Sequence, residues 1–267
     1  MVMKKKTLNL TTVILAAIMG CMIIVSCGGS DSKTIEDEKL AGYLIGGIYV
    51  YHGYGDAGSA LIKQLEGYVP EGANFTKRLH SAYNEIMINP FSDIRESDLK
   101  RGLRDWWEVN DKNDLSEMIE SLQSGRHSVR FQKIYDAVKQ AGGKSANAAD
   151  ISVEDADEEQ IQFVIDNFDV VSSTGIKAWD YARAANLIFD GEGLKWFTTE
   201  EGEALLAKLL STVRESYSDW DTYHKDFEMG RRFWAGDPEN DSEFTELVGL
   251  LTSDNEYVIY HYLPLKK

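Results

Sequence analysis

Cysteine, proline and positive charge are all scarce in this sequence. Cys21 and Cys27 are the only cysteines among 267 residues, and both lie in the N-terminal apolar stretch, so the rest of the chain cannot form a disulfide. None of the four prolines interrupts a segment with helical periodicity, which favours a helical fold. Lys and Arg number 28 against 44 Asp and Glu, and the net charge of −16 excludes nucleic acid as a partner because phosphate backbones would be repelled.

The N-terminus has the features of a secretory signal. Three basic residues, Lys4 to Lys6, precede an apolar run from Val13 to Val25. A helix of that length reaches roughly 20 Å, which is too short for a hydrocarbon core of about 30 Å. The sequence Ile24-Val25-Ser26-Cys27 resembles a bacterial lipobox, and Cys21 fits this pattern less well because the bulky Met19 lies before it. We therefore expect residues 1–26 to be a lipoprotein signal peptide and Cys27 to be the lipidated residue.

Acylation of Cys27 would determine where the protein is found. The acyl chains would attach it to a membrane of the bacterial cell envelope, and we expect the outer membrane, with the protein facing the periplasm or the cell surface. Residues 27–39 are small, polar and mostly acidic, which predicts a flexible tether.

Residues 40–267 are predicted to form a mainly α domain, a multi-helix orthogonal bundle. Hydrophobic residues make up 43% of the chain and aromatic residues 11%, enough for a real core. The segment 142–157 is small and acidic and has no aromatic residue, so it is either a mobile loop or a linker between two possible subdomains, 40–141 and 158–267. Residues 255–263 are rich in β-branched and aromatic side chains, which predicts a short C-terminal strand or an extended tail.

Tryptophans concentrate in the segment 175–234, which has the most distinctive composition in the chain. Four of the six tryptophans lie there: Trp179, Trp196, Trp220 and Trp234. Trp179, Asp180 and Arg183 share one strip of a predicted helix, where an arginine can stack on indole and pair with a carboxylate. This strip is interpreted either as a buried lock between helices or as part of a binding site.

The same segment offers little for metal or covalent chemistry. Asp221, His224 and Glu228 share a helical face, but the HExxH order is missing and the chain has only five histidines. We expect neither a metal nor a cofactor. A hydrolase remains the alternative hypothesis, with Asp180 and a second carboxylate, Asp105 or Asp226, as acid and base.

The residues of this segment are similar to a bacterial family known as domain of unknown function 1266. The resemblance rests on the following residues: Gly175, Ile176, Ala178, Trp179, Asp180, Arg183, Trp196, Trp220, Tyr223, Gly230, Arg231, Phe233 and Trp234, with Leu103, Trp106, Trp107, Gly125 and Arg126 upstream. The family pattern has Gly-His-Arg where this chain has Gly125-Arg126-His127. The resemblance covers roughly residues 97–236 and implies an α-helical domain with no agreed activity.

Together these features favour a non-enzymatic binding or interaction module of the cell envelope. The expected partner is an unknown protein or small molecule, because aromatic and arginine-rich helical surfaces are typical of interfaces. The candidate residues for binding, or for a structural lock, are Trp179, Asp180, Arg183, Trp220, Tyr223, Arg231 and Trp234.

Overall fold

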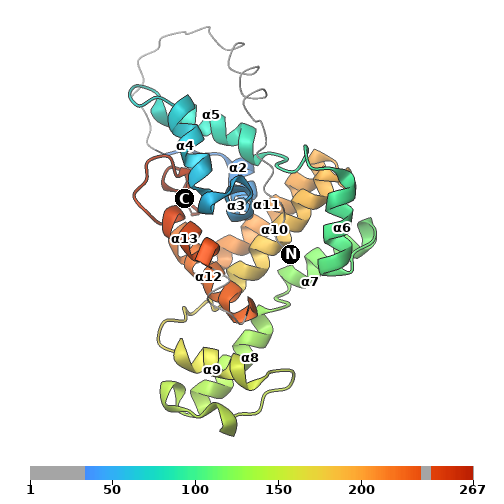
Figure 1. The fold of residues 1–267 in the computed structure, drawn as a ribbon, viewed down its shortest axis with the longest axis vertical. Helices are drawn as coiled ribbons and strands as arrows, with labels where there is room; N and C mark the ends of the chain where they lie inside the picture. Colours follow the sequence, from blue (N-terminus) through green and yellow to red (C-terminus); the bar gives the residue numbers. More distant parts are fainter. Residues whose placement is uncertain (1–33, 236–241, 267) are drawn as a thin grey trace.

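The computed structural model describes residues 34–235 and 242–266. Within these ranges the regular secondary structure consists of helices joined by turns and loops (Figure 1). The main helices are α2 (Glu38–Leu44), α3 (Gly47–Tyr54), α4 (Ser59–Tyr68), α5 (Phe75–Met87), α6 (Glu96–Trp107), α7 (Lys112–Gln123), α8 (Ser128–Gln140), α9 (Glu158–Asp166), α10 (Lys177–Gly193), α11 (Thr199–Ser216), α12 (Trp220–Ala235) and α13 (Ser242–Leu251). The prediction of a mainly α bundle is confirmed. Within the described ranges, no helix combines the length and the apolar character needed to cross a bilayer.

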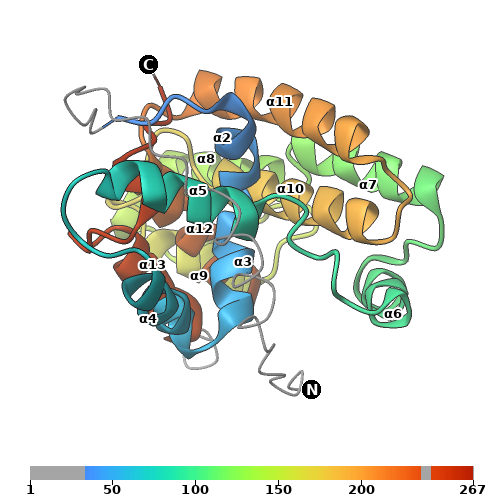
Figure 2. The same ribbon diagram turned by 90° about the horizontal axis from the view of Figure 1, so that it is seen from above.

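Helix α10 is the centre of the fold. It packs against α7, α11 and α12, and Figure 2 shows α7 and α11 running alongside it. Most of its side chains are buried, and its alanines let neighbouring helices come close. The junction between α2 and α3 also comes close to α10, since a Cβ at Gly46 would lie 2.7 Å from the Phe189 ring and 2.9 Å from Ala185. A substituted side chain at Gly46 would therefore separate the two segments.

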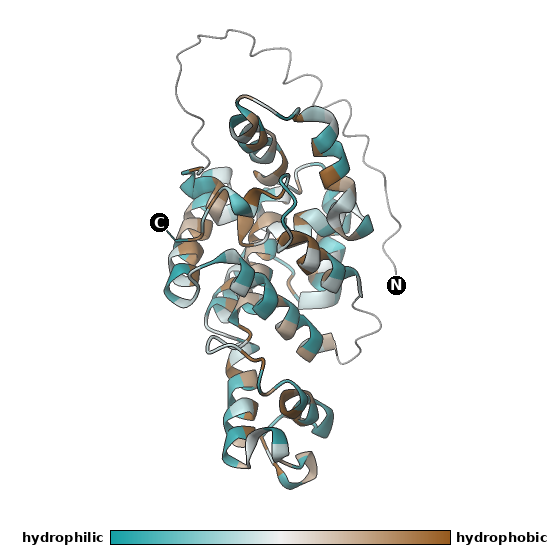
Figure 3. Cartoon of the chain, turned by 90° about the vertical axis from the view of Figure 1, so that its left-hand side faces the viewer, coloured by the Kyte–Doolittle hydropathy of each residue, from teal (hydrophilic) through white to brown (hydrophobic). Residues whose placement is uncertain are grey.

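A smaller hydrophobic cluster lies beside the main core. Most of its side chains come from α8 and α9. It also includes Ile176, which directly precedes α10, and Phe233, which lies near the end of α12. Figures 1 and 3 show the α8–α9 unit extending away from the larger helical body. In Figure 3 its helices carry both apolar and polar residues, as amphipathic helices do.

The acidic segment 142–157 belongs to this smaller cluster. It forms two short 3₁₀ turns, Gly143–Ser145 and Ala148–Asp150, which contact α8 and α9. Gly143 adopts a φ of 64°, and a Cβ there would lie 2.8 Å from the Phe168 ring. Both the backbone conformation and the lack of space therefore favour glycine at this turn. In the structure this segment therefore packs onto helices on both of its sides.

The C-terminal segment 255–263 forms no strand. Its regular part is a 3₁₀ turn, Ile259–His261, and the hydroxyl of Tyr260 donates to the backbone carbonyl of Leu44 at 2.9 Å. Val258 and Leu263 are buried in the main core. The β-branched and aromatic enrichment that suggested a strand arises here from burial of a tail against helices.

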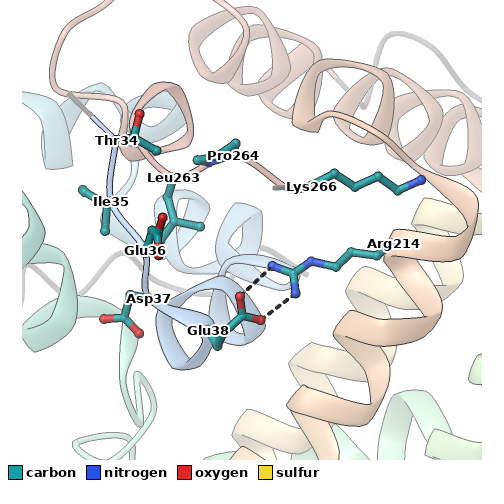
Figure 4. Close-up of a pocket in the computed structure, with 9 residues that line it drawn as sticks. All are labelled: Thr34, Ile35, Glu36, Asp37, Glu38, Arg214, Leu263, Pro264 and Lys266. Atoms are coloured by element: carbon teal, nitrogen blue, oxygen red, sulfur yellow. Dashed lines mark hydrogen bonds and ion pairs between the residues drawn. The ribbon is translucent and has the colours of Figure 1, made fainter. Parts of the chain in front are cut away.

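The N-terminal end of the described chain is fixed to this tail. The N–H of Ile35 donates to the carbonyl of Tyr262 at 2.6 Å, and Asp37 caps α2 through the N–H of Leu40. The guanidinium of Arg214 donates to the carboxylate of Glu38 at 2.5 and 3.3 Å (Figure 4). The Nε of Arg214 donates to the carbonyl of Leu265. A hollow of about 290 Å³ lies here, between the first and the last of the described residues. The fold therefore begins inside the segment 27–39 that was expected to be a flexible tether.

Glu192 is a buried carboxyl group near the end of α10. It accepts a hydrogen bond from the hydroxyl of Tyr43 at 2.9 Å, while its second oxygen has no partner among the described residues. Gly202 of α11 packs directly on this carboxyl group, and a larger residue there would displace the carboxyl group from its present position. Burial raises the pKa of Glu192 to about 7.

We expect Glu192→Gln to change how stability depends on pH. A carboxyl group whose pKa rises on folding, here from 4.5 to about 7, holds its proton in the folded state across this window, so stability falls as pH rises through it. The glutamine variant lacks this dependence and should gain on the order of 1–3 kcal/mol relative to wild type between pH 4.5 and 8. Urea unfolding at both pH values measures the difference, with the exposed Glu120→Gln as control. A constant difference across the range would contradict the buried protonated state.

Candidate functional site

Asp180 lies on α10, and its fully buried carboxylate caps the start of a different helix. It accepts the backbone N–H of His127 at 3.0 Å and that of Ser128 at 2.8 Å. Helix α8 begins at Ser128, and the first N–H groups of a helix lack partners within it. A carboxylate placed there satisfies these donors and interacts favourably with the helix dipole. Asp180 of α10 therefore fixes the start of α8.

His127 connects Asp180 to Arg183. Its Nδ1 lies 2.6 Å from Asp180 Oδ1, and its Nε2 lies 3.3 Å from Arg183 Nη1. An arginine can only donate, so Nε2 is the acceptor and the ring proton is on Nδ1. The arrangement is thus carboxylate, imidazole and guanidinium in series, instead of the direct pairing of Asp180 with Arg183 that the sequence suggested.

The guanidinium of Arg183 is enclosed by three indole rings. Its central carbon lies 4.1 Å from the centroid of Trp107, 4.8 Å from Trp179 and 5.4 Å from Trp234. Burial lowers the pKa of Arg183 from its ordinary value, yet an arginine stays protonated at neutral pH. We call Trp107, His127, Trp179, Asp180, Arg183 and Trp234 the Arg183 site.

One side of the Arg183 site is open to solvent. Trp179 is 2% exposed, whereas Trp234 is 48% exposed and packs on Trp179 with the ring centroids 6.0 Å apart. Arg183 and Trp107 are partly exposed. The neighbouring Trp106 on α6 is 73% exposed, which is unusual for so large an apolar side chain.

Arg231 of α12 extends this arrangement. Its guanidinium lies 5.8 Å from the Trp179 ring and 4.3 Å from the ring of Phe244. The preceding residue, Gly230, allows the contact between α12 and α10, because a Cβ there would collide with the Cβ of Trp179. Trp179, Arg183, Arg231 and Trp234 are thus brought together as the sequence suggested.

Trp220 and Tyr223 lie elsewhere, in the buried half of α12. The indole N–H of Trp220 donates to the carbonyl of Leu263 at 2.8 Å, and the hydroxyl of Tyr223 donates to the carbonyl of Ile45 at 2.8 Å. The adjacent His224 is also buried, and burial lowers its pKa to about 3. These side chains hold the C-terminal tail and the α2–α3 junction against the core, so they cannot form one groove with Trp234.

The other candidate carboxylates do not join Asp180. Asp226 accepts a hydrogen bond from Ser172 at 2.6 Å, and burial raises its pKa to about 6. Asp105 is exposed and pairs with Arg104. Across residues 34–235 and 242–266, no three His, Cys, Asp or Glu side chains gather to hold a metal ion.

A family model matches most of the helical domain. It is described as a protein of unknown function (DUF1266), and it covers residues 102–265, beyond the range of about 97–236 expected from the tryptophan pattern. The chain belongs to this family. The DUF1266 region includes every member of the Arg183 site.

Two similar proteins come from Escherichia coli K12, and both are described as uncharacterized. The protein YbeR is 25% identical over 51% of this chain and 57% of its own length, and YbeU is 24% identical over 62% of this chain and 69% of its own length. The chain thus spans little more than half the length of YbeR. No solved structure matches it.

Asp180→Asn tests how strongly the buried carboxylate holds α8. The asparagine amide keeps the shape of the carboxylate but loses its charge. Its NH₂ group would replace one carboxylate oxygen and would face the N–H donors at the start of α8, from which it cannot accept a hydrogen bond. We expect a loss of about 2–4 kcal/mol in the free energy of unfolding, measured with urea. The exposed Asp105→Asn should change stability by less than about 0.5 kcal/mol. Equal effects of the two substitutions would contradict the capping role.

Proposed function

We propose that this DUF1266 protein is a cell-envelope lipoprotein whose helical domain is a non-enzymatic binding module. The binding surface is the solvent-facing side of the Arg183 site. The observation that carries this proposal is the position of Arg183, whose guanidinium contacts Trp107, Trp179 and a half-exposed Trp234. Tryptophan and arginine are the residue types most enriched at binding hot spots.

The burial and the hydrogen bonds of Asp180 favour a binding function over a catalytic one. Asp180 is fully buried, and it accepts N–H groups from His127 and Ser128. A general acid or base must reach the substrate directly or through one water molecule. Asp180 is thus better suited to holding the site together than to acid–base catalysis, which is why the hydrolase is the second candidate.

The lipoprotein part of the proposal rests on the lipobox at Cys27 and on the position of the first described residues. Thr34 and Ile35 lie beside the C-terminal tail, where Ile35 pairs with Tyr262. An extended chain from Cys27 to Thr34 reaches at most about 25 Å, so an anchor at Cys27 would keep this end of the domain close to the bilayer.

Labelling with palmitate tests the anchor. Wild-type protein expressed in a Gram-negative host should incorporate the label, Cys27→Ser should lose it, and Cys21→Ser should keep it. The readout is labelled protein on a gel together with fractionation of the membranes. Incorporation that survives Cys27→Ser would remove the lipobox assignment.

Trp234→Ala tests the binding surface. We expect at least one envelope component, protein or small molecule, to be retained by the immobilised wild-type protein and lost with the variant, because the half-exposed indole forms the edge of the site. The matched control is Val170→Ala, which alters another exposed apolar side chain, 69% exposed and lying outside the Arg183 site. Mass spectrometry of the retained material identifies the component. If Trp234→Ala retains everything that wild type retains, while its melting temperature stays within a few degrees, the surface is not used for binding.

A further inference from the structure

The Arg183 site has more hydrogen-bond donors than acceptors. The indole N–H of Trp179 is buried and has no acceptor among the described residues. Arg183 is not in an ion pair anywhere in residues 34–235 or 242–266, and it has a hydrogen-bond contact with the imidazole of His127. Asp180, the nearest carboxylate, already accepts three N–H groups. A buried donor without an acceptor destabilises the folded state, and so does a buried cation without a counter-ion.

Positive charge predominates locally although the whole chain is acidic. After burial, the groups with the main effect on the pKa of Arg183 are Tyr49 and Asp180, which favour its protonated form, and Arg126 and Arg231, which oppose it. Asp190 lies two turns further along α10, about 10 Å away. Burial raises the pKa of Asp190 to about 8, so this carboxyl group is mostly protonated at neutral pH and adds little negative charge near Arg183.

The shape of the site restricts the ligand further. The guanidinium presents a planar set of donors that matches a carboxylate or a phosphate. Trp107 and Trp234 flank it, so an apolar group attached to the anion would contact indole. Arg126 is exposed at the edge of the site and can add a second positive charge.

We propose that the Arg183 site binds a small molecule that carries a carboxylate or a phosphate monoester next to an apolar or aromatic group. The anionic group lies on Arg183, with Arg126 beside it, and accepts the N–H groups there, while the apolar group packs against Trp107 and Trp234. This proposal rests on the proposed binding function and names its class of ligand.

Calorimetric titration of the full chain with benzoate and phenyl phosphate tests the proposal. Binding should be saturable for at least one of the two, weaker for acetate and inorganic phosphate, and absent for benzyl alcohol, which has the ring without the charge. Whether benzoate or phenyl phosphate binds more tightly distinguishes a carboxylate ligand from a phosphate ligand. Equal binding of benzyl alcohol, or no binding of any anion, would overturn the proposal.

Substitutions locate the ligand. Arg183→Lys keeps the charge but loses the planar fork, and should weaken binding about tenfold or more. Arg126→Gln alters an exposed residue that does not threaten folding, and should weaken binding several-fold. The control is Arg232→Gln, which removes an arginine of the same helix as Arg231, one that lies 5.7 Å from Phe163 in the smaller cluster. If Arg232→Gln weakens binding as much as Arg126→Gln does, the effect is one of general charge and the proposed site is wrong.

The N–H of Trp179 gives a signal from inside the site. Its nitrogen–proton resonance, assigned with Trp179→Phe, should shift as anion is added to wild type and should not shift in Arg183→Lys. The same titration is repeated with Asp237→Asn, Glu239→Gln and Asp241→Asn combined, because these acidic residues follow α12 in the sequence and lie outside the described residues. Anion binding seen only in this triple variant would mean that the chain supplies its own anion, which overturns the proposal.

The two proposals can fail separately. If Trp234→Ala loses an envelope component while no anion binds, the binding surface stands and the ligand class is wrong. If anions bind with the expected dependence on Arg183 while Trp234→Ala retains every envelope component, the anion site stands without the wider binding surface.

Discussion

The buried carboxylate of Asp180 is the constraint on which the arrangement of the two hydrophobic clusters depends. It lies on α10, in the main core, and it caps α8, which belongs to the smaller cluster. A carboxylate without hydrogen bonds would be strongly unfavourable at this depth. It therefore requires the start of α8 to lie against α10, and the same hydrogen bonds bring the ring of His127 to Arg183.

The Arg183 site follows from this constraint. Once α8 is held, His127 occupies one side of the guanidinium and the indoles of α6, α10 and α12 occupy the others. Hydrophobic residues of similar size often stabilise a fold as well as buried charges do, so a charged centre is weak support for stability alone. The charged centre lies at the edge of the core with one side open to solvent, and it is this position that the proposed binding function takes as its basis.

The local part of this arrangement could be predicted from the sequence, and the long-range part could not. Helical spacing predicts that Trp179, Asp180 and Arg183 share one strip of a helix, and the structure has that helix as α10. The partner of Asp180 lies 53 positions earlier, at His127, and no periodicity relates the two. Trp220 and Trp234 were both candidate residues, but they are 14 residues apart on one helix, which separates them by about 21 Å along its axis. The sequence could not decide between a short strand and a tail at the C-terminus, because burial against helices and pairing in a sheet select the same residue types.

The order of Arg126 and His127 decides which of these two residues of the family pattern faces the interior and which is exposed. In this chain the imidazole points inward, where it links Asp180 and Arg183, and the arginine before it is exposed. The reverse order would place an arginine against Asp180, where it would pair directly with the carboxylate, and it would remove the exposed charge near Arg183. The inward position therefore governs how α8 is held, and the outward position governs the charge at the solvent-facing edge of the Arg183 site.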